Sequence, residues 1–259
     1  MRVVRHRDRR RRAKGRRALW SGGEVLVTAG VVLMLLVVHQ LWWTNREARQ
    51  GAERKVEALE KEWGTRGGGG SDSGATPFAS AVRPAAKGAT GGVRRRPEGD
   101  VVASGRPHAS QAYAVLTVPR LGLRVPVAEG VSKPDVLNKG YVGHYPGTQQ
   151  PGRAGNFALA GHRNTHGEPF RYLPRLRPGD TIEVETATAT YMYAVDRILP
   201  RTSSRDSGVI RPVPRSIVRP SYGYDEPGYY ITLTTCTPEF TSRYRMAVWG
   251  KLVSMRPRG

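Results

Sequence analysis

The sequence has one cysteine, Cys236, among its 259 residues. A single cysteine excludes an internal disulfide and also excludes zinc sites built from several cysteines. A lone thiol is either a buried structural side chain or a reactive group, and most free cysteines are buried. The residues that accompany Cys236 therefore decide between these two interpretations.

Acidic residues are also scarce, with 21 Asp and Glu against 42 Lys and Arg, which gives a net charge of +21. The basic residues crowd into the first twenty positions, and elsewhere they are scattered rather than aligned with aromatic residues. This arrangement predicts no nucleic-acid binding. Attraction to an anionic membrane or cell wall is the simpler use of the charge. The few carboxylates form no calcium-binding loop, so we expect no metal.

Long apolar runs are absent except for one, Val25 to Val38, which Leu41, Trp42 and Trp43 extend. This span has about the length that crosses a membrane, and a tryptophan pair suits the far interface. Residues 40–44 lack the small side chains of a signal-peptide cleavage site. We predict a basic cytoplasmic tail at 1–23 and a single-pass plasma-membrane anchor at 24–43, with the rest of the chain extracellular.

Two segments of low hydrophobicity follow the anchor. Residues 44–63 predict a charged helix in which Val56, Leu59 and Trp63 recur at helical spacing. These three side chains would suit a weak self-association seam, but we expect a solvated stalk. Residues 64–110 are rich in Gly, Ser and Pro and predict a flexible linker.

The last segment, 111–259, predicts one folded domain. Its short runs of Val, Ile, Thr and Tyr are separated by Pro and Gly, as in an all-β sandwich or barrel. We predict a mainly β, mixed β-barrel with short helices at 134–137 and 169–173. Internal repeats and a dinucleotide-type glycine loop are absent. The expected strands are 114–118, 123–127, 156–160, 181–185, 190–198, 230–235 and 245–252.

Cys236 lies at the end of one of these strands, because Pro238 cannot donate the hydrogen bond that would continue the strand ladder. Cysteine chemistry needs a proton donor for the leaving group, so a histidine should lie nearby. His162 follows a strand and a glycine, as a strand-end residue should, and ranks first. His144 lies in a turn-rich loop that could line a cleft. His166 follows His162 by four residues, but a glycine-rich context makes a helical metal pair a poor interpretation.

The chemistry also needs a positive group for a developing oxyanion. Arg243 and Arg245 both enter the final strand, which a turn would return alongside the Cys236 strand. Strand alternation alone does not choose between the two.

Several motifs together resemble the sortase family of Gram-positive envelopes, which are β-barrel cysteine transpeptidases. These are Leu233-Thr234-Thr235-Cys236, the run from Asn156 to Arg163 that contains Ala-Gly-His, and an arginine entering the last strand. The resemblance implies that Cys236 is the nucleophile, that His162 protonates the leaving amine and that Arg245, rather than Arg243, stabilises the oxyanion. The reaction that this resemblance implies requires no cofactor.

The segment from Gly143 to Thr148 and the pair Pro169-Phe170 resemble the class E branch of high-GC actinobacteria. The implied reaction cleaves an LAxTG or LPxTG sorting signal between Thr and Gly and attaches surface proteins to a peptidoglycan precursor or another amine. Tyr145, Thr234 and Thr235 are the candidate substrate-binding residues.

Three alternatives stay open. Thr237, directly after Cys236, resembles the pilin-polymerising class C branch, although no lid segment is evident before the barrel. A cysteine hydrolase or an L,D-transpeptidase could act on peptidoglycan itself, although the latter would carry a Ser-x-Gly-Cys type of signature, which is not found here. A non-catalytic envelope scaffold would hold Cys236 as a structural side chain.

Overall fold

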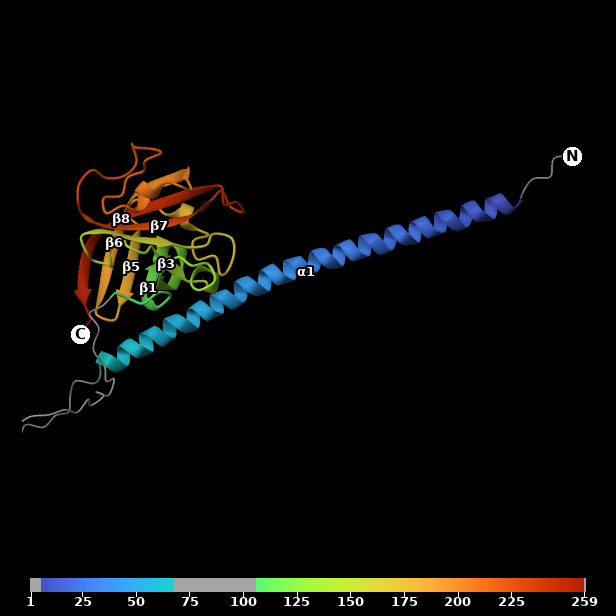
Figure 1. Cartoon of the computed structure of the whole chain (residues 1–259). Helices are drawn as coiled ribbons and strands as arrows, with labels where there is room; N and C mark the ends of the chain where they lie inside the picture. The colour runs from blue at the N-terminus through green and yellow to red at the C-terminus, as the bar shows by residue number, and fades with distance from the viewer. Residues whose placement is uncertain (1–5, 68–105, 259) are drawn as a thin grey trace, which may run out of the picture.

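A computed structural model describes residues 6–67 and 106–258 (Figure 1). A long helix, α1 (His6–Gly67), runs beside a closed eight-stranded barrel. Most of the predicted linker, residues 68–105, lies outside the described residues, as do residues 1–5 and 259.

The barrel closes in the order β1-β2-β3-β4-β7-β8-β6-β5. The β2–β3 and β4–β7 pairs are parallel, and the other pairs are antiparallel. The mixed barrel is the predicted fold class. Its strands are β1 (Ala112–Val118), β2 (Leu123–Glu129), β3 (Val142–His144), β4 (Gly155–Ala160), β5 (Thr181–Thr186), β6 (Ala189–Ser203), β7 (Tyr229–Thr237) and β8 (Tyr244–Pro257).

All seven predicted strands are present, and β3 was missed because three residues carry too little alternation to be recognised. The two predicted short helices are 3₁₀ turns shifted toward the C-terminus, η2 (Leu137–Lys139) and η3 (Leu173–Arg175). Two further 3₁₀ turns, η1 (Pro119–Leu121) and η4 (Ser207–Ile210), were not predicted. Such turns are too short to show helical periodicity in the sequence.

Strand alternation divides the barrel residues into an inner and an outer set. On β4 and β7, Phe157, Leu159, Ile231 and Leu233 point into the main core with residues of the other strands. The residues between them point outward, and part of this outer face is covered by the β6–β7 connection. There Trp249 is fully buried and donates from Nε1 to the carbonyl oxygen of Val209 at 3.0 Å.

Helix α1 does not leave the barrel as a solvated stalk, so that expectation is wrong. Ala48, Ala52, Val56, Leu59 and Trp63 are all buried, and the last three pack with β1 and β2 residues in one cluster. The apolar seam recognised in the sequence therefore meets the barrel instead of a second helix. A spacing of three and four residues shows that one face is apolar, but it does not say what covers that face.

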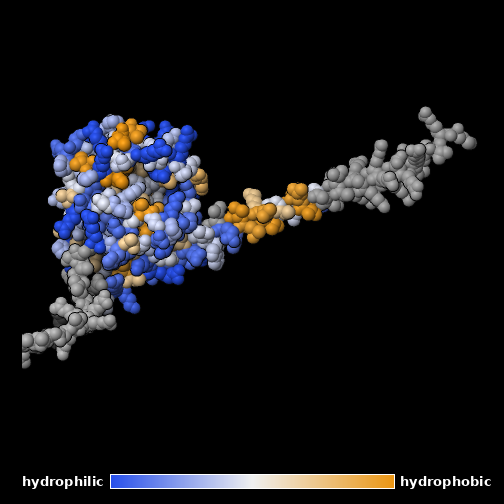
Figure 2. All heavy atoms as spheres, in the orientation of Figure 1, coloured by the Kyte–Doolittle hydropathy of each residue, from blue (hydrophilic) through white to orange (hydrophobic). Residues whose placement is uncertain are grey.

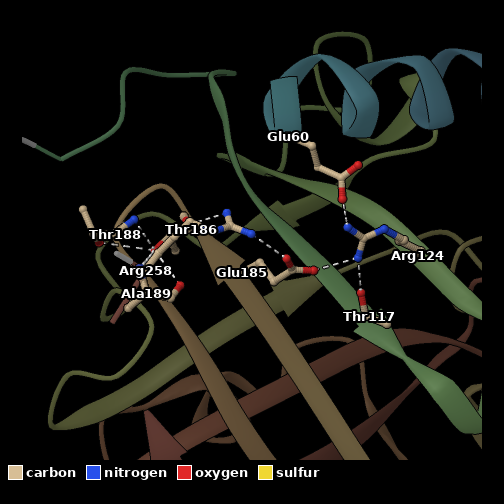
Figure 3. Close-up of polar contacts among 8 residues, drawn as sticks. All are labelled: Glu60, Thr117, Arg124, Glu185, Thr186, Thr188, Ala189 and Arg258. Atoms are coloured by element: carbon tan, nitrogen blue, oxygen red, sulfur yellow. Dashed lines mark hydrogen bonds and ion pairs between the residues drawn. The ribbon is translucent and has the colours of Figure 1, made fainter. Parts of the chain in front are cut away.

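A network of ion pairs fastens the C-terminal part of α1 to the barrel (Figure 3). Glu60 of α1 pairs with Arg124 of β2, which also pairs with Glu185 of β5 at 2.7 Å. Glu185 in turn binds Arg258 at 3.0 Å, and the Arg258 guanidinium lies 4.9 Å from the centre of the Trp63 ring. Arg124 remains partly exposed, so these pairs fix the position of the helix more than they add stability.

Candidate active site

Strand register brings two of the predicted catalytic residues side by side. Cys236 on β7 is the direct partner of Arg245 on β8 in the antiparallel ladder. On the other side of β7, Ala160 of β4 pairs with Thr234 in a parallel ladder. The loop that follows β4 stays beside the end of β7, because Gly161 donates to the Thr234 carbonyl and Arg163, directly after His162, donates to the Cys236 carbonyl. Cys236 and Arg245 therefore lie on the neighbouring strands β7 and β8, and His162 lies in the loop directly after β4.

The two strand positions, Cys236 and Arg245, lie on the outer face of the barrel. Leu233 and Met246 point into the core, so the alternating residues Cys236 and Arg245 point outward. Cys236 is half-buried and carries a free thiol. The side chain is thus reachable from solvent, unlike a structural core cysteine.

The segment leading to His162 is held tightly by its neighbours. Gly161 accepts a hydrogen bond from the Thr235 hydroxyl at 2.9 Å, and its amide donates to the Thr234 carbonyl at 3.1 Å. A side chain at Gly161 would meet the Phe170 ring at 2.6 Å, so only glycine fits here. In the Ala-Gly-His motif, Ala160 therefore ends β4, Gly161 packs closely against Phe170, and His162 begins the loop that follows.

His162 itself contacts two polar groups that sequence reasoning did not assign. Its Nε2 donates to Oδ1 of Asn138 at 2.9 Å, and its ring stacks on that of His166 with centroids 5.3 Å apart. Burial, with smaller contributions from the His166 and Lys133 charges, lowers the pKa of His162 to about 4. The imidazole is therefore neutral at pH 7.

Arg245 and Arg243 differ clearly in environment. The Arg245 side chain is half-buried and donates to the carbonyl oxygens of Ser242 and Tyr244 at 2.8 and 3.0 Å. Arg243 is exposed and lies over the Tyr244 ring at 5.2 Å. Only Arg245 stands opposite Cys236 in the ladder.

A family model described as a sortase domain matches residues 116–253. The chain belongs to the sortase family. Sortase SrtE1 of Streptomyces coelicolor is 42% identical over 99% of this chain and 64% of its own length. Sortase SrtE2 of the same organism is 34% identical over 89% of this chain and 80% of its own length.

Among solved structures, that of sortase E1 from Streptomyces coelicolor with a tripeptide in its active site is 52% identical and has a TM-score of 0.55. It covers 59% of this chain and 94% of that chain. Sortase E from Streptomyces avermitilis is 39% identical, with a TM-score of 0.51, over 58% of this chain and 93% of that chain. The chain thus spans just under two thirds of the length of SrtE1, with 64% of that protein matched.

Of the three predicted substrate-binding residues of this sortase, Tyr145 and Thr234 contact each other, whereas Thr235 contacts Gly161. The hydroxyl of Tyr145 lies 3.1 Å from Oγ1 of Thr234, two residues before Cys236 on the same face of β7. Thr234 also donates to the Leu159 carbonyl at 3.0 Å. Thr235 is buried and points the other way, toward Gly161, so its side chain positions the His162 segment instead of facing a peptide.

His144 is a further candidate from the sequence that the structure places. His144 is almost fully buried, and its Nδ1 lies 2.7 Å from a Glu129 carboxylate oxygen, which makes it a structural residue under the Tyr145 loop and not part of a cleft. Among the residues described, no group of three or more His, Cys, Asp or Glu side chains could hold a metal ion.

Sequence reasoning missed two residues at this site. Arg163 donates to the Cys236 carbonyl at 3.2 Å and to the Thr237 hydroxyl at 3.0 Å, so it ties the histidine loop to the nucleophile strand. Asn138 belongs to η2, far from His162 in sequence. The position of Arg163 directly after His162 was a usable signal, whereas nothing in the sequence indicates the role of Asn138.

The lowered pKa of His162 predicts a sortase that loses stability in mild acid. The unfolded chain, with an ordinary histidine pKa of about 6.5, binds more protons than the folded chain between pH 6.5 and about 4. Stability should therefore fall as the pH falls through this window. With allowance for the partial exposure of the ring, we expect a loss on the order of 1 kcal/mol between pH 7 and pH 5.

Thermal unfolding of the detergent-solubilised protein at these two pH values measures this effect. His162→Gln should reduce the difference, because glutamine does not titrate. Since the pKa values of His144 and His166 are also lowered, mainly by burial, part of the difference should persist in the variant. An unchanged difference in His162→Gln would contradict the assignment to His162.

Proposed function

We propose that this chain is a membrane-anchored cysteine transpeptidase in which Cys236, His162 and Arg245 carry out the chemistry. The observation that carries the proposal is the register of β4, β7 and β8. It gives a reachable thiol an arginine partner on one side and a histidine segment on the other. A structural thiol needs neither neighbour.

In the proposed reaction, a sorting signal of the LAxTG or LPxTG type lies over the outer face near Tyr145 and Thr234. The Cys236 thiol passes its proton to His162, its sulfur attacks the Thr carbonyl, and the Arg245 guanidinium stabilises the oxyanion. As the peptide bond breaks, His162 gives its proton to the departing Gly amine and leaves a thioester. A second amine then attacks the thioester and loses a proton to His162, which returns this proton to the departing sulfur and restores the thiol.

The electrostatics of His162 favour a slow enzyme. Since burial lowers its pKa to about 4, the resting imidazole is neutral at pH 7. A charged proton donor forms only if the thiol proton passes to this poorly solvated ring, which costs free energy. We expect modest turnover.

The partners and location follow from the same proposal. Within residues 6–67 and 106–258, one helix, α1, is long and apolar enough to cross a membrane, and its apolar stretch is exposed. We propose that the basic N-terminus is cytoplasmic and that the barrel acts outside the plasma membrane on surface proteins. A peptidoglycan precursor or another protein amine accepts the acyl group. The tripeptide in the active site of the Streptomyces coelicolor sortase E1 structure supports a peptide substrate.

Mass spectrometry of the full-length protein in detergent, with LAxTG and LPxTG peptides and an amine acceptor, tests the proposal. We expect cleavage between Thr and Gly, an acyl-enzyme on Cys236 and transfer to the amine. The whole chain is used because α1 packs on the barrel.

The preferred peptide and acceptor also separate the alternatives. Transfer to a pilin lysine in preference to a peptidoglycan stem amine would favour the class C-like function. If folded protein with a titratable thiol forms no acyl-enzyme with either peptide, the transpeptidase proposal fails and the scaffold interpretation takes its place.

A further inference from the structure

The membrane-proximal part of α1 contacts the loop that begins with His162. Asn45 donates from Nδ2 to Glu168 at 2.9 Å, and Arg49 pairs with the same carboxylate at 3.0 Å. Arg49 also donates from Nε to the Gly167 carbonyl at 3.1 Å. Glu168 is buried, and Arg171 of its own loop completes its partners at 2.7 Å. A buried carboxylate with three partners is a specific contact and not a chance approach.

A second contact joins α1 to the turn that holds Asn138. Gly140 has a positive φ of 79°, and a side chain there would meet the Ala48 carbonyl oxygen at 2.8 Å. The helix backbone thus lies directly against the end of η2. Both segments that position His162, its own loop and the Asn138 turn, contact the same two turns of α1.

These two turns come immediately after the apolar stretch of the helix. Trp43 ends that stretch, and Arg49 follows it by six residues, which is about 9 Å along a helix axis. Figure 2 shows the apolar side chains of α1 beginning directly beside the barrel. The end of the barrel that carries the candidate active site is therefore the end next to the membrane-crossing stretch.

The β7–β8 hairpin at this end has the composition of a membrane-contacting tip. Phe240 is 77% exposed and has a positive φ of 62°, a strained conformation for a bulky residue. At the start of β8, the guanidinium groups of Arg243 and Arg201 each lie over the Tyr244 ring, 5.2 and 5.1 Å from its centre. Neither arginine has an ion-pair partner among the residues described. In Figure 1 this hairpin projects from the barrel on the same side as the N-terminal half of α1.

We propose that the catalytic end of the barrel rests on the anionic membrane surface, with Phe240 in the lipid interface and Arg201 and Arg243 against the headgroups. This inference rests on the anchoring part of the proposed function. Aromatic residues favour the interface, and arginines near an anionic leaflet are attracted to it. Substrates would then reach Cys236 along the membrane surface, which favours a membrane-held peptide and acceptor over soluble ones.

Fluorescence quenching by lipids that carry a nitroxide near the headgroup tests the orientation. Full-length Cys236→Ala protein receives one new cysteine, labelled with an environment-sensitive fluorophore, and is reconstituted into liposomes containing phosphatidylglycerol. Phe240→Cys reports on the hairpin, and Ala187→Cys, in the exposed β5–β6 turn at the other end of the barrel, is the matched control. Val38→Cys reports insertion of the anchor.

We expect quenching at position 240 to be at least about twofold stronger than at position 187, because only an interfacial label approaches the nitroxide. Arg49→Glu should lower quenching at 240 toward the level at 187, because the new carboxylate would repel Glu168 and weaken the contact between α1 and the barrel. Arg54 is exposed on another face of the helix, so Arg54→Glu should leave the quenching unchanged. Quenching at 38 with equal signals at 240 and 187 would overturn the orientation but leave the anchor intact. No quenching at 38 would overturn the anchor and the orientation together, while peptide cleavage by the wild type tests the chemistry separately.

Discussion

Cys236→Ala is expected to abolish both the acyl-enzyme and the transfer product. The thiol is the only cysteine in the chain, and its strand position faces outward beside Arg245. Without a nucleophile at this point, neither half of the exchange has a covalent route. Intact-mass spectrometry with an LAxTG peptide measures the loss directly as the missing acyl adduct.

The folded state should survive this change, because Cys236 is only half-buried and alanine removes a single sulfur atom. An unchanged melting temperature is therefore the control. Cys236→Ser supplies a second control, since it keeps the shape and lacks the thiol. Transfer product at wild-type levels from a folded Cys236→Ala protein would show that the nucleophile lies elsewhere.

Arg245→Ala is expected to lower kcat by roughly 10² to 10³-fold, which is the usual cost of removing one oxyanion donor. Arg243→Ala is the matched control and should retain most of the activity. The two arginines are separated by one residue, yet only Arg245 is the ladder partner of Cys236, while Arg243 is exposed on the hairpin. Steady-state cleavage of the preferred peptide measures both.

Arg245→Lys should recover only part of the rate, because an ammonium group cannot reproduce the planar guanidinium donors. If Arg245 stabilises the transition state, replacing it should lower kcat more than it changes KM. Equal losses for Arg243→Ala and Arg245→Ala would argue against the assignment and would point to a general need for positive charge near the hairpin.

The sequence by itself predicted most of the framework. Alternation and turn residues predicted seven of the eight strands, and Pro238 correctly indicated where β7 ends, one residue beyond Cys236 at Thr237. The lone cysteine, the Ala-Gly-His motif and the returning arginine selected residues that the fold places on β7, directly after β4 and on β8. These features are local, so a linear reading detects them.

Tertiary structure alone decided how the parts meet. The seam of Val56, Leu59 and Trp63 was visible, but only folding showed that it packs on the barrel and not on solvent or another helix. Asn138 reaches His162 across 24 residues, and Asn45 reaches Glu168 across 123. Periodicity reports which face of a segment is apolar, whereas its partner depends on long-range packing that no local pattern encodes. The sequence therefore determined most of the elements and the candidate catalytic residues, and the fold decided their neighbours and the low pKa of His162, because burial follows from packing.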